Sequence, residues 1–73
     1  QQRINTAHML AGVTMVDPDQ VWVSPETTIG MDTVIYPGVT LLGKCAIGQD
    51  CILGPNSHLR DARLEDGTKH FVS

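Results

Sequence analysis

The sequence predicts an all-β fold, a parallel β-helix of six-residue repeats with a short helix before it, because the repeat has three regular columns. From Val23 onward, an aliphatic residue stands at every sixth position. A period of six fits neither an amphipathic helix nor a surface strand, and it is typical of hexapeptide-repeat solenoids. The aliphatic column is Val23, Ile29, Ile35, Leu41, Ile47, Leu53 and Leu59.

Two further columns explain how each coil closes. Residues two apart on a strand share a face, so the small residue two positions before each aliphatic one is predicted to point inward with it. The residue before the small one is Gly, Asn or Asp in four of six repeats, and these types tolerate turn backbone. Those positions are the predicted corners. The small column is Thr27, Thr33, Val39, Cys45, Cys51 and Ser57, and the corner column is Glu26, Asp32, Gly38, Lys44, Asp50 and Asn56.

Three strands and three corners make a triangular coil, so residues three repeats apart are predicted to lie above one another at about 4.8 Å. The step from Leu59 to Leu64 is one residue short, and Ala62 keeps the small position in register. The next full step reaches His70, a poor core residue, so the regular pattern is expected to end near Lys69. The expected ladders are Val23, Leu41 and Leu59; Ile29 and Ile47; and Ile35 and Leu53.

The segment before the repeat is predicted to contain a helix that stops at Gly12. A strand and a turn at Asp17 and Pro18 are expected to follow and to cover the open end of the solenoid. The expected organisation is the end of a linker helix over 1–12, a capping strand and turn over 13–22, β-helix coils over 23–69 and an irregular end over 70–73.

Composition excludes two kinds of partner. The 73 residues carry a formal net charge of -3 and one each of Trp, Tyr and Phe, so there is neither a basic stripe nor an aromatic platform for nucleic acid. This stretch has no apolar run of about 18 residues and no secretory leader, so no membrane partner is expected. The chain begins without Met and stops in mid-pattern, and we expect it to be a piece of a longer protein.

Two stretches resemble a known enzyme family. They are RINTAHMLAGVTMVDPD before the repeats and TVIYPGVTLLGKCAIGQDCILGPNSHL within them. Both are similar to the bacterial bifunctional N-acetylglucosamine-1-phosphate uridyltransferase and glucosamine-1-phosphate N-acetyltransferase. The resemblance covers about Arg3 to Gly67, and its RIN, HMLAGV and DP elements are more specific than the repeats, which many acyltransferases share.

The resemblance implies a left-handed β-helix that forms a homotrimer and is joined by a long helix to an N-terminal nucleotidyltransferase domain. Such an enzyme transfers an acetyl group from acetyl-CoA to glucosamine-1-phosphate. It then transfers a uridylyl group from UTP, with Mg²⁺, and produces UDP-N-acetylglucosamine for cell-wall synthesis. The parent protein is therefore expected to be a cytoplasmic enzyme.

The resemblance carries no catalytic, cofactor-binding or metal-binding residue onto this chain. The nucleotide loop and the magnesium ligands of the family precede the RIN helix, so Asn5 is not the family's asparagine ligand, and the acetyltransferase residues follow Ser73. We expect residues 1–73 to serve as scaffold and trimer interface and to be inactive alone. The alternatives are a stand-alone oligomerising module without catalysis and a monofunctional hexapeptide acyltransferase.

Cysteine and histidine residues are the other candidates for chemistry. Cys45 and Cys51 fall in the small inward column, and buried free thiols are favoured over a disulfide or a metal pair, which suits a reducing cytoplasm. Two cysteines cannot make a structural zinc site by themselves. His8, His58 and His70 fall on the helix, at a corner and beyond the regular pattern. They are interpreted as surface or capping residues rather than metal ligands or a general base.

Charged and glycine residues are given structural interpretations. Basic and acidic side chains interleave near the end of the chain, and compensating surface charges are favoured over a phosphate site. Glycines directly after aliphatic positions are interpreted as backbone accommodation rather than a phosphate loop. The charged residues are Arg60, Asp61, Arg63, Glu65, Asp66 and Lys69, and the glycines are Gly30, Gly48 and Gly54.

Several large apolar residues are predicted to face outward. Apolar side chains on a flat solenoid face favour packing against another subunit, and we assign them to trimer contact. They are Trp22, Met31, Val34, Tyr36 and Leu42.

An Ile47→Asp substitution tests the inward column. We expect the solenoid to unfold, because an unpaired carboxylate would be buried between coils. Far-UV circular dichroism measures the loss of strand structure. An unchanged spectrum would contradict the assignment of Ile47 to the core.

Overall fold

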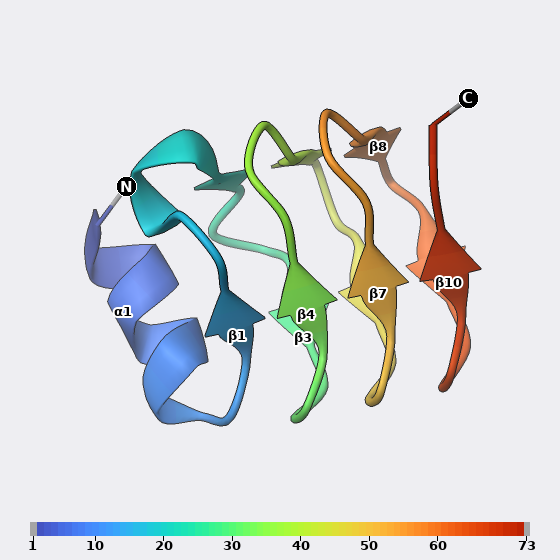
Figure 1. Ribbon diagram of the computed structural model, residues 1–73, viewed down its shortest axis with the longest axis horizontal. Coiled ribbons are helices and arrows are strands. Elements are labelled where there is room, and N and C mark those ends of the chain that lie inside the picture. Colours follow the sequence, from blue (N-terminus) through green and yellow to red (C-terminus); the bar gives the residue numbers. More distant parts are fainter. Residues whose placement is uncertain (1, 73) are drawn as a thin grey trace.

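The computed structural model describes residues 2–72 and shows a solenoid of parallel strands with one helix at its N-terminal end (Figure 1). Helix α1 spans Gln2–Leu10, strand β1 spans Thr14–Met15, and a 3-10 turn, η1, spans Pro18–Gln20. The later strands contain two or three residues each. They are β2 (Trp22–Val23), β3 (Thr28–Ile29), β4 (Val34–Ile35), β5 (Thr40–Leu42), β6 (Ala46–Ile47), β7 (Ile52–Leu53), β8 (His58–Arg60), β9 (Arg63–Leu64) and β10 (Lys69–His70).

The strands form three parallel sheets, one for each side of a triangular coil. The sheet orders are β1-β4-β7-β10, β2-β5-β8 and β3-β6-β9. In Figure 1 the chain runs upward along the front strands β1, β4, β7 and β10 and passes to the back of the molecule at the top. It then runs down the back, returns to the front at the bottom, and advances from left to right with each coil. This sense is left-handed, so the predicted left-handed parallel β-helix is confirmed.

The predicted ladders are present in the strand register. Val23 lies opposite Leu41, which lies opposite Leu59. The other two sides pair Ile29 with Ile47 and Ile35 with Leu53. After the short unit, Ile47 pairs with Leu64, so the deletion is absorbed without loss of the inward column.

The third ladder is longer than predicted at both ends. Met15 pairs with Ile35 of the next coil, the one above it, and His70 pairs with Leu53 of the preceding coil, the one below it. His70 was expected to begin an irregular end, but it lies in β10 because backbone pairing does not require an apolar side chain: the Gly54 N–H donates to the His70 carbonyl at 2.7 Å. Ser73, in the same expected end, lies outside the described residues.

Four of the six predicted corners have left-handed backbone. Positive φ angles occur at Asp32, Gly38, Asp50 and Asn56, as their residue types predicted. At Lys44 the prediction is wrong by one position, because Gly43 takes the positive φ of 68° instead. The remaining predicted corner, at Glu26, is the first in the chain and has no residue with positive φ. The chain turns there through a hydrogen bond from the Thr27 N–H to the Ser24 carbonyl at 3.2 Å.

Helix α1 ends where Gly12 was expected to stop it. Gly12 has a φ of 104°, its N–H donates to the Met9 carbonyl at 3.1 Å, and the Val13 N–H donates to the His8 carbonyl at 3.0 Å. These two bonds form a Schellman motif, which satisfies carbonyls that the helix leaves free. The chain can therefore turn directly from α1 into β1.

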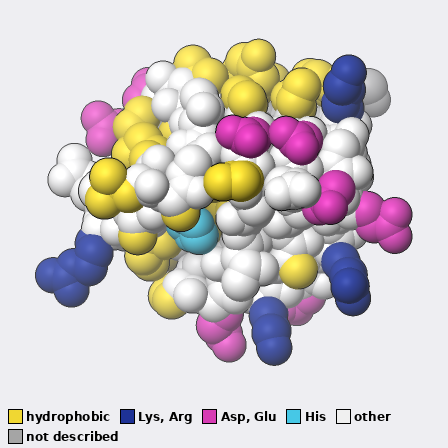
Figure 2. Space-filling model, turned by 90° about the horizontal axis from the view of Figure 1, so that it is seen from below, with side chains coloured by type: hydrophobic (Ala, Val, Ile, Leu, Met, Phe, Trp, Pro, Cys, Tyr) yellow, Lys and Arg dark blue, Asp and Glu magenta, His cyan; other side chains and the backbone are white. Residues whose placement is uncertain are grey.

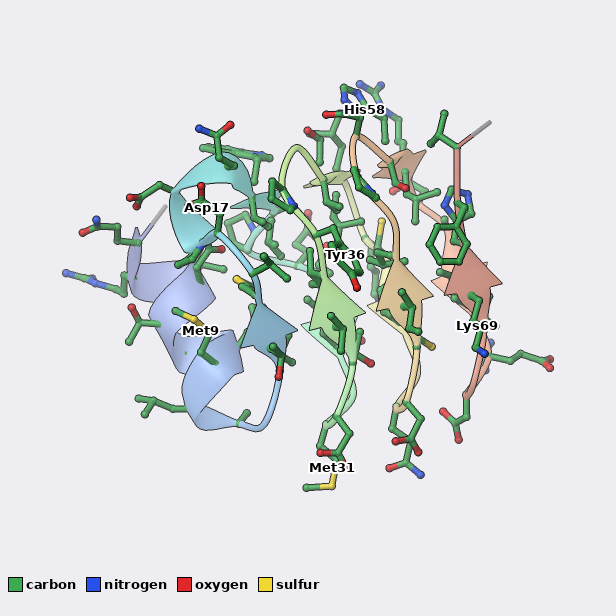
Figure 3. All side chains as sticks on the ribbon, in the orientation of Figure 1. Met9, Asp17, Met31, Tyr36, His58 and Lys69 are labelled. Atoms are coloured by element: carbon green, nitrogen blue, oxygen red, sulfur yellow. The ribbon has the colours of Figure 1, made fainter. Side chains whose placement is uncertain are left out.

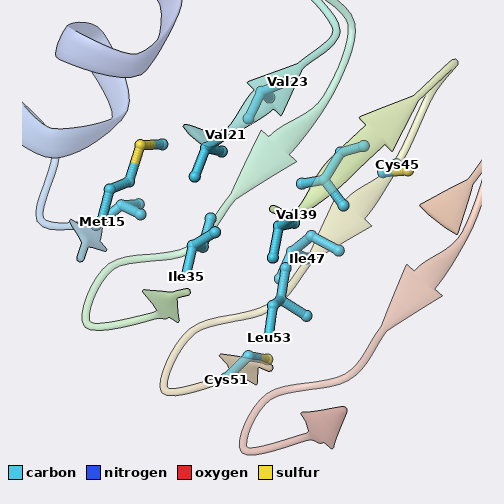
Figure 4. Close-up of a cluster of buried hydrophobic side chains, with 11 residues drawn as sticks. Met15, Val21, Val23, Ile35, Val39, Cys45, Ile47, Cys51 and Leu53 are labelled. Carbon is cyan, nitrogen blue, oxygen red and sulfur yellow. The ribbon is translucent and has the colours of Figure 1, made fainter. Parts of the chain in front are cut away.

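The core is narrow and contains both inward columns (Figure 4). Ile35, Leu41 and Leu53 are fully buried. The small polar residues of the core are also satisfied: the Thr33 hydroxyl donates to the Gly48 carbonyl, and the Ser57 hydroxyl donates to the Gly54 carbonyl, both at 2.8 Å. Hydroxyl side chains in this column therefore fill the narrow positions of the core. They also donate hydrogen bonds to backbone carbonyls that the strands do not pair.

Gly30 lies where the backbones of two coils approach closely. A Cβ atom at Gly30 would lie 2.4 Å from the Gln49 backbone nitrogen and 2.6 Å from the Gly48 carbonyl carbon. Real Cβ atoms do not tolerate such contacts with backbone, so Gly30 is required by space and not by its φ angle. Gly67 is the opposite case, with a φ of 78° and no atom within 4 Å of the point where a Cβ would lie.

Gly30→Ala and Gly67→Ala separate these two effects. We expect Gly30→Ala to lower the unfolding free energy by about 3 kcal/mol, because coils must move apart. Gly67→Ala should cost only about 1 kcal/mol, the penalty of left-handed backbone. Urea unfolding measures both values, and equal losses would contradict the close approach at Gly30.

Candidate functional site

Both cysteines are buried free thiols, as predicted. Cys45 and Cys51 are at most 1% exposed, and neither forms a disulfide. The Cys45 thiol donates to the Leu42 carbonyl at 3.3 Å, and the Cys51 thiol donates to the Glu65 carbonyl at 3.2 Å. Each thiol therefore fills a small core position and bonds backbone in the way that the core hydroxyls do.

The three histidines lie on different elements. His8 is half-buried on α1, and burial lowers the pKa of its imidazole below the usual 6.5. His58 was expected at a corner, but it lies within β8, paired with Thr40, because its exposed side chain occupies an outward strand position. The His70 Nδ1 atom lies 3.2 Å from the Ser57 hydroxyl.

The role of His70 follows from its contact with Ser57. The Ser57 hydroxyl already donates to the Gly54 carbonyl, so it accepts from Nδ1 of His70. The His70 side chain thus contacts the preceding coil instead of lying free beyond the solenoid. Within residues 2–72, no three His, Cys, Asp or Glu side chains gather closely enough to hold a metal ion.

The predicted basic group does not form one surface. Arg60, Arg63 and Lys69 lie on β8, β9 and β10, which belong to three different sheets. The carboxylates between them bond the coil below: Asp61 accepts from the Lys44 N–H at 2.8 Å, and Asp66 accepts from the Gln49 N–H at 2.9 Å. These acids fix the stacking of neighbouring corners, which agrees with a structural interpretation of the charged residues.

An open hollow of about 490 Å³ lies on the outer face of the β3-β6-β9 sheet. It forms because Ala46 and Gly48 are small, and Arg63 and Glu65 of the next coil stand beside them. Ligand sites in proteins bury most of the surface of the molecule they hold. This hollow is shallow and wide, so its shape suits surface contact better than enclosure of a substrate.

Several apolar side chains lie on the outer face of the four-stranded sheet. Val34 and Ile52 lie opposite each other on β4 and β7, and Tyr36 lies beside them, all half-buried. Val16 and Phe71 extend this face and are 56% and 59% exposed. In Figure 2, hydrophobic side chains gather along the upper edge, which is the front of Figure 1 and therefore this sheet. We call these five residues the apolar face.

The five residues that were assigned to subunit contact lie on different surfaces of the solenoid. Val34 and Tyr36 belong to the apolar face, whereas Trp22 and Leu42 lie on the β2-β5-β8 sheet. Met31 lies at a corner, at the lower edge of Figure 3. A single contact surface therefore contains only two of them.

Four residues of interest were missed by sequence reasoning, and one of them is Phe71 of the apolar face. Ile52 stands eighteen residues after Val34 in an outward position, so the period alone could have found it. Val16 follows the inward Met15 and pairs its N–H with the Ile35 carbonyl at 3.0 Å, a register that the sequence did not reveal. Asn5 is buried on α1 and bonds residues far along the chain, so no local pattern marks it.

None of the described helices is long and apolar enough to cross a membrane. This finding concerns residues 2–72.

The fold and its repeat define a class, the hexapeptide-repeat β-helix proteins. Residues 26–61 match the family model described as bacterial transferase hexapeptide (six repeats). This match covers most of the coils and agrees with the period that the sequence displays.

Over nearly its whole length the chain is similar to proteins named bifunctional protein GlmU. It is 52% identical to the protein of Halalkalibacterium halodurans over 68 residues, 93% of this chain and 15% of that protein. It is 48% identical to the protein of a Geobacillus species over 100% of this chain and 16% of that protein. It is 50% identical to the protein of Mycobacterium tuberculosis over 90% of this chain and 13% of that protein.

These matches confirm the predicted resemblance. They include residues before the repeat as well as the coils, because they cover 90% or more of the chain. The chain spans about one sixth of the length of the relatives it matches.

Proposed function

We propose that this chain forms the helix junction and first coils of a bifunctional enzyme of UDP-N-acetylglucosamine synthesis. The enzyme would acetylate glucosamine-1-phosphate with acetyl-CoA and then transfer a uridylyl group from UTP to the product. The observation that carries this proposal is the 52% identity to a bifunctional protein GlmU across both the helix segment and the coils.

The proposed role of residues 1–73 is that of a scaffold, with no catalytic, cofactor-binding or metal-binding residue. The carboxylates of Asp61 and Asp66 are engaged with backbone N–H groups of the coil below, and they do not suit a Mg²⁺ site, which needs oxygen ligands arranged around one point. Mg²⁺, acetyl-CoA, UTP and the sugar phosphate would bind to other parts of the protein.

We further propose that the scaffold forms a homotrimer through the apolar face. The outward column of this sheet reads Thr14, Val34, Ile52 and, at its C-terminal end, Lys69. In the other two sheets the third position is already a histidine or an arginine. Apolar patches of this kind on a soluble protein mark contact surfaces. Copies related by rotation about an axis parallel to the solenoid would bring the same residues together at each level.

A cytoplasmic location is proposed for the protein. Its support is chemical: Cys45 and Cys51 are both free thiols, and compartments that keep thiols reduced are typically cytosolic.

Ile52→Lys and Ala46→Lys test the contact surface with a matched pair. Both residues face outward on neighbouring sheets of the same coil. We expect Ile52→Lys to reduce the mass in solution to one third, because three ammonium groups would meet in an apolar contact. Ala46→Lys should leave the trimer intact.

Sedimentation equilibrium of the natural polypeptide that carries these residues measures this mass. Circular dichroism controls for loss of the coil in each variant. A trimer that persists in Ile52→Lys and dissociates in Ala46→Lys would place the contact on the β3-β6-β9 sheet and contradict the proposal.

The intact polypeptide also tests the enzymatic proposal. Its mass in the source cells should be several times 7.9 kDa, the mass of this chain, and it should catalyse both acetyl transfer and uridylyl transfer. Residues 1–73 alone should catalyse neither. A natural species of about 7.9 kDa that lacks both activities would instead support a stand-alone oligomerising module.

A further inference from the structure

Helix α1 docks on the coils around a polar side chain. It packs against η1 and β2 of the first coil, at the left in Figure 1. Among the described residues of α1 the buried one is Asn5, which is 2% exposed, whereas Ile4 and Met9 pack on the core while only partly buried. A surface helix ordinarily docks through an apolar stripe. The contact of α1 therefore has a polar group where an apolar one is usual.

The Asn5 amide joins the helix to the first and last residues of the η1 segment. Its Nδ2 atom donates to the Pro18 carbonyl at 2.9 Å and to the Val21 carbonyl at 3.0 Å. Both protons of the amide are therefore used. Val21 continues directly into β2, where the Trp22 N–H donates to the Val39 carbonyl of the next coil at 3.0 Å. One side chain thus connects α1 to backbone that the coils hold in place.

Hydrogen bonds from Asn5 restrict the direction of the helix in a way that apolar contact does not. A hydrogen bond weakens steeply when its donor and acceptor leave alignment, whereas hydrophobic attraction has no preferred direction. Oδ1 of Asn5 is buried without a hydrogen-bond partner among the described residues, and burial of such an acceptor is unfavourable. An apolar residue at this position would avoid that cost and would lose the directional constraint.

A second attachment lies at the C-terminal end of α1. The Gly12 carbonyl accepts from the Asp32 N–H at 2.8 Å, and the Thr14 N–H donates to the Thr33 carbonyl, also at 2.8 Å. These bonds fix the end of the helix to the corner before β4. Along a helix, Asn5 and Gly12 are about 10 Å apart at ~1.5 Å per residue. Two attachments at that separation define the direction of the α1 axis, whereas either one alone would leave a pivot.

From these contacts we propose that Asn5 is an orientation anchor, which together with the Gly12 attachment fixes the direction of α1 relative to the first coils. The inference rests on the proposed function in one respect, because there α1 is the end of a longer helix that leads from another domain. The anchor makes that helix leave the solenoid in one direction. Without the two Asn5 bonds, α1 stays against the coil through its apolar contacts and pivots near Gly12.

Electron–electron double resonance between two spin labels measures the direction of α1 in the natural polypeptide. The labels are attached through Gln2→Cys, at the end of α1 far from Gly12, and Arg63→Cys, on β9 in the last described coil, and both residues are exposed. Labelled chains are diluted with unlabelled chains, so each distance lies within one copy. The buried thiols of Cys45 and Cys51 give the background, measured without the added cysteines. We expect one narrow distribution of distances.

Substitution of Asn5 tests the anchor. Asn5→Leu removes both donors and adds apolar surface, and we expect the distribution of distances to become at least twofold broader. Far-UV circular dichroism should not change, because Ile4 and Met9 still hold α1 on the coil. Asn5→Ala removes the same donors without added volume and should broaden the distribution as much. Thr6→Leu is the matched control, an exposed neighbour on α1, and should leave the distribution as narrow as in the unmodified protein.

Three results would overturn the assignment of Asn5. A narrow distribution in both Asn5 variants would show that the contacts of Ile4 and Met9 fix the direction of α1. A broad distribution in the unmodified protein would show that the direction is not fixed. Loss of strand structure in both variants would show that Asn5 supports the whole fold.

The labels report on α1 and the coils alone, so this test is separate from the test of the proposed function. Acetyl transfer and uridylyl transfer are assayed on the same polypeptide without labels. A protein that lacks both activities but shows a narrow distribution, broadened by both Asn5 variants, would contradict the proposed function and retain the anchor. A protein with both activities and a distribution that the Asn5 variants leave narrow would do the reverse.

Discussion

Stacking of one coil upon the next is the interaction on which the rest of this structure depends. Each strand contains only two or three residues, so no strand can be stable by itself. Its N–H groups donate to carbonyls of the adjacent coil, as Val34 does to Cys51 at 2.9 Å, and its inward aliphatic side chain lies against the equivalent one there. Solenoids depend on such neighbour contacts because each repeat touches only the next.

The close stacking of coils also explains why glycine and acidic residues occur at particular positions on the corners and beside the strands. Coils separated by one strand spacing leave little room where backbone approaches backbone, so Gly30 is required beside Gln49. At other corners a polar side chain of one coil bonds the coil below, as Asp61 does to the Lys44 N–H. Glycine and acidic residues that could suggest a binding site therefore allow the coils to stack closely or hydrogen-bond one coil to the next. The surface that we propose for contact with other subunits is the apolar face.

The sequence predicted the fold well because a six-residue period is a property of the whole coil. It placed Ile35, Leu41 and Leu53 in the core and anticipated left-handed backbone at Asp32 and Asn56, since these depend only on spacing and residue type. The sequence could not place the residue that turns the Lys44 corner, because β5 has three residues and moves the positive φ to Gly43.

Prediction of the candidate surfaces was less complete for a physical reason. Outward positions carry no strict repeat, so Trp22 and Val34 were assigned to one contact although they face different directions on a triangle. Arg60 and Arg63 were likewise grouped in the prediction, but the corner at Asp61 places them on different sides of the triangle. Asn5 was missed because its partners are 13 and 16 residues away.

Nuclear Overhauser effects between core methyl groups test the stacking most directly. Ile47 has two predicted neighbours in adjacent coils, Ile29 eighteen residues before it and Leu64 seventeen residues after it. The stacked coil predicts strong effects from the Ile47 methyl groups to both residues. Contact with Ile29 but not Leu64 would show that the short unit breaks the inward column, and contact with neither would contradict the triangular β-helix itself.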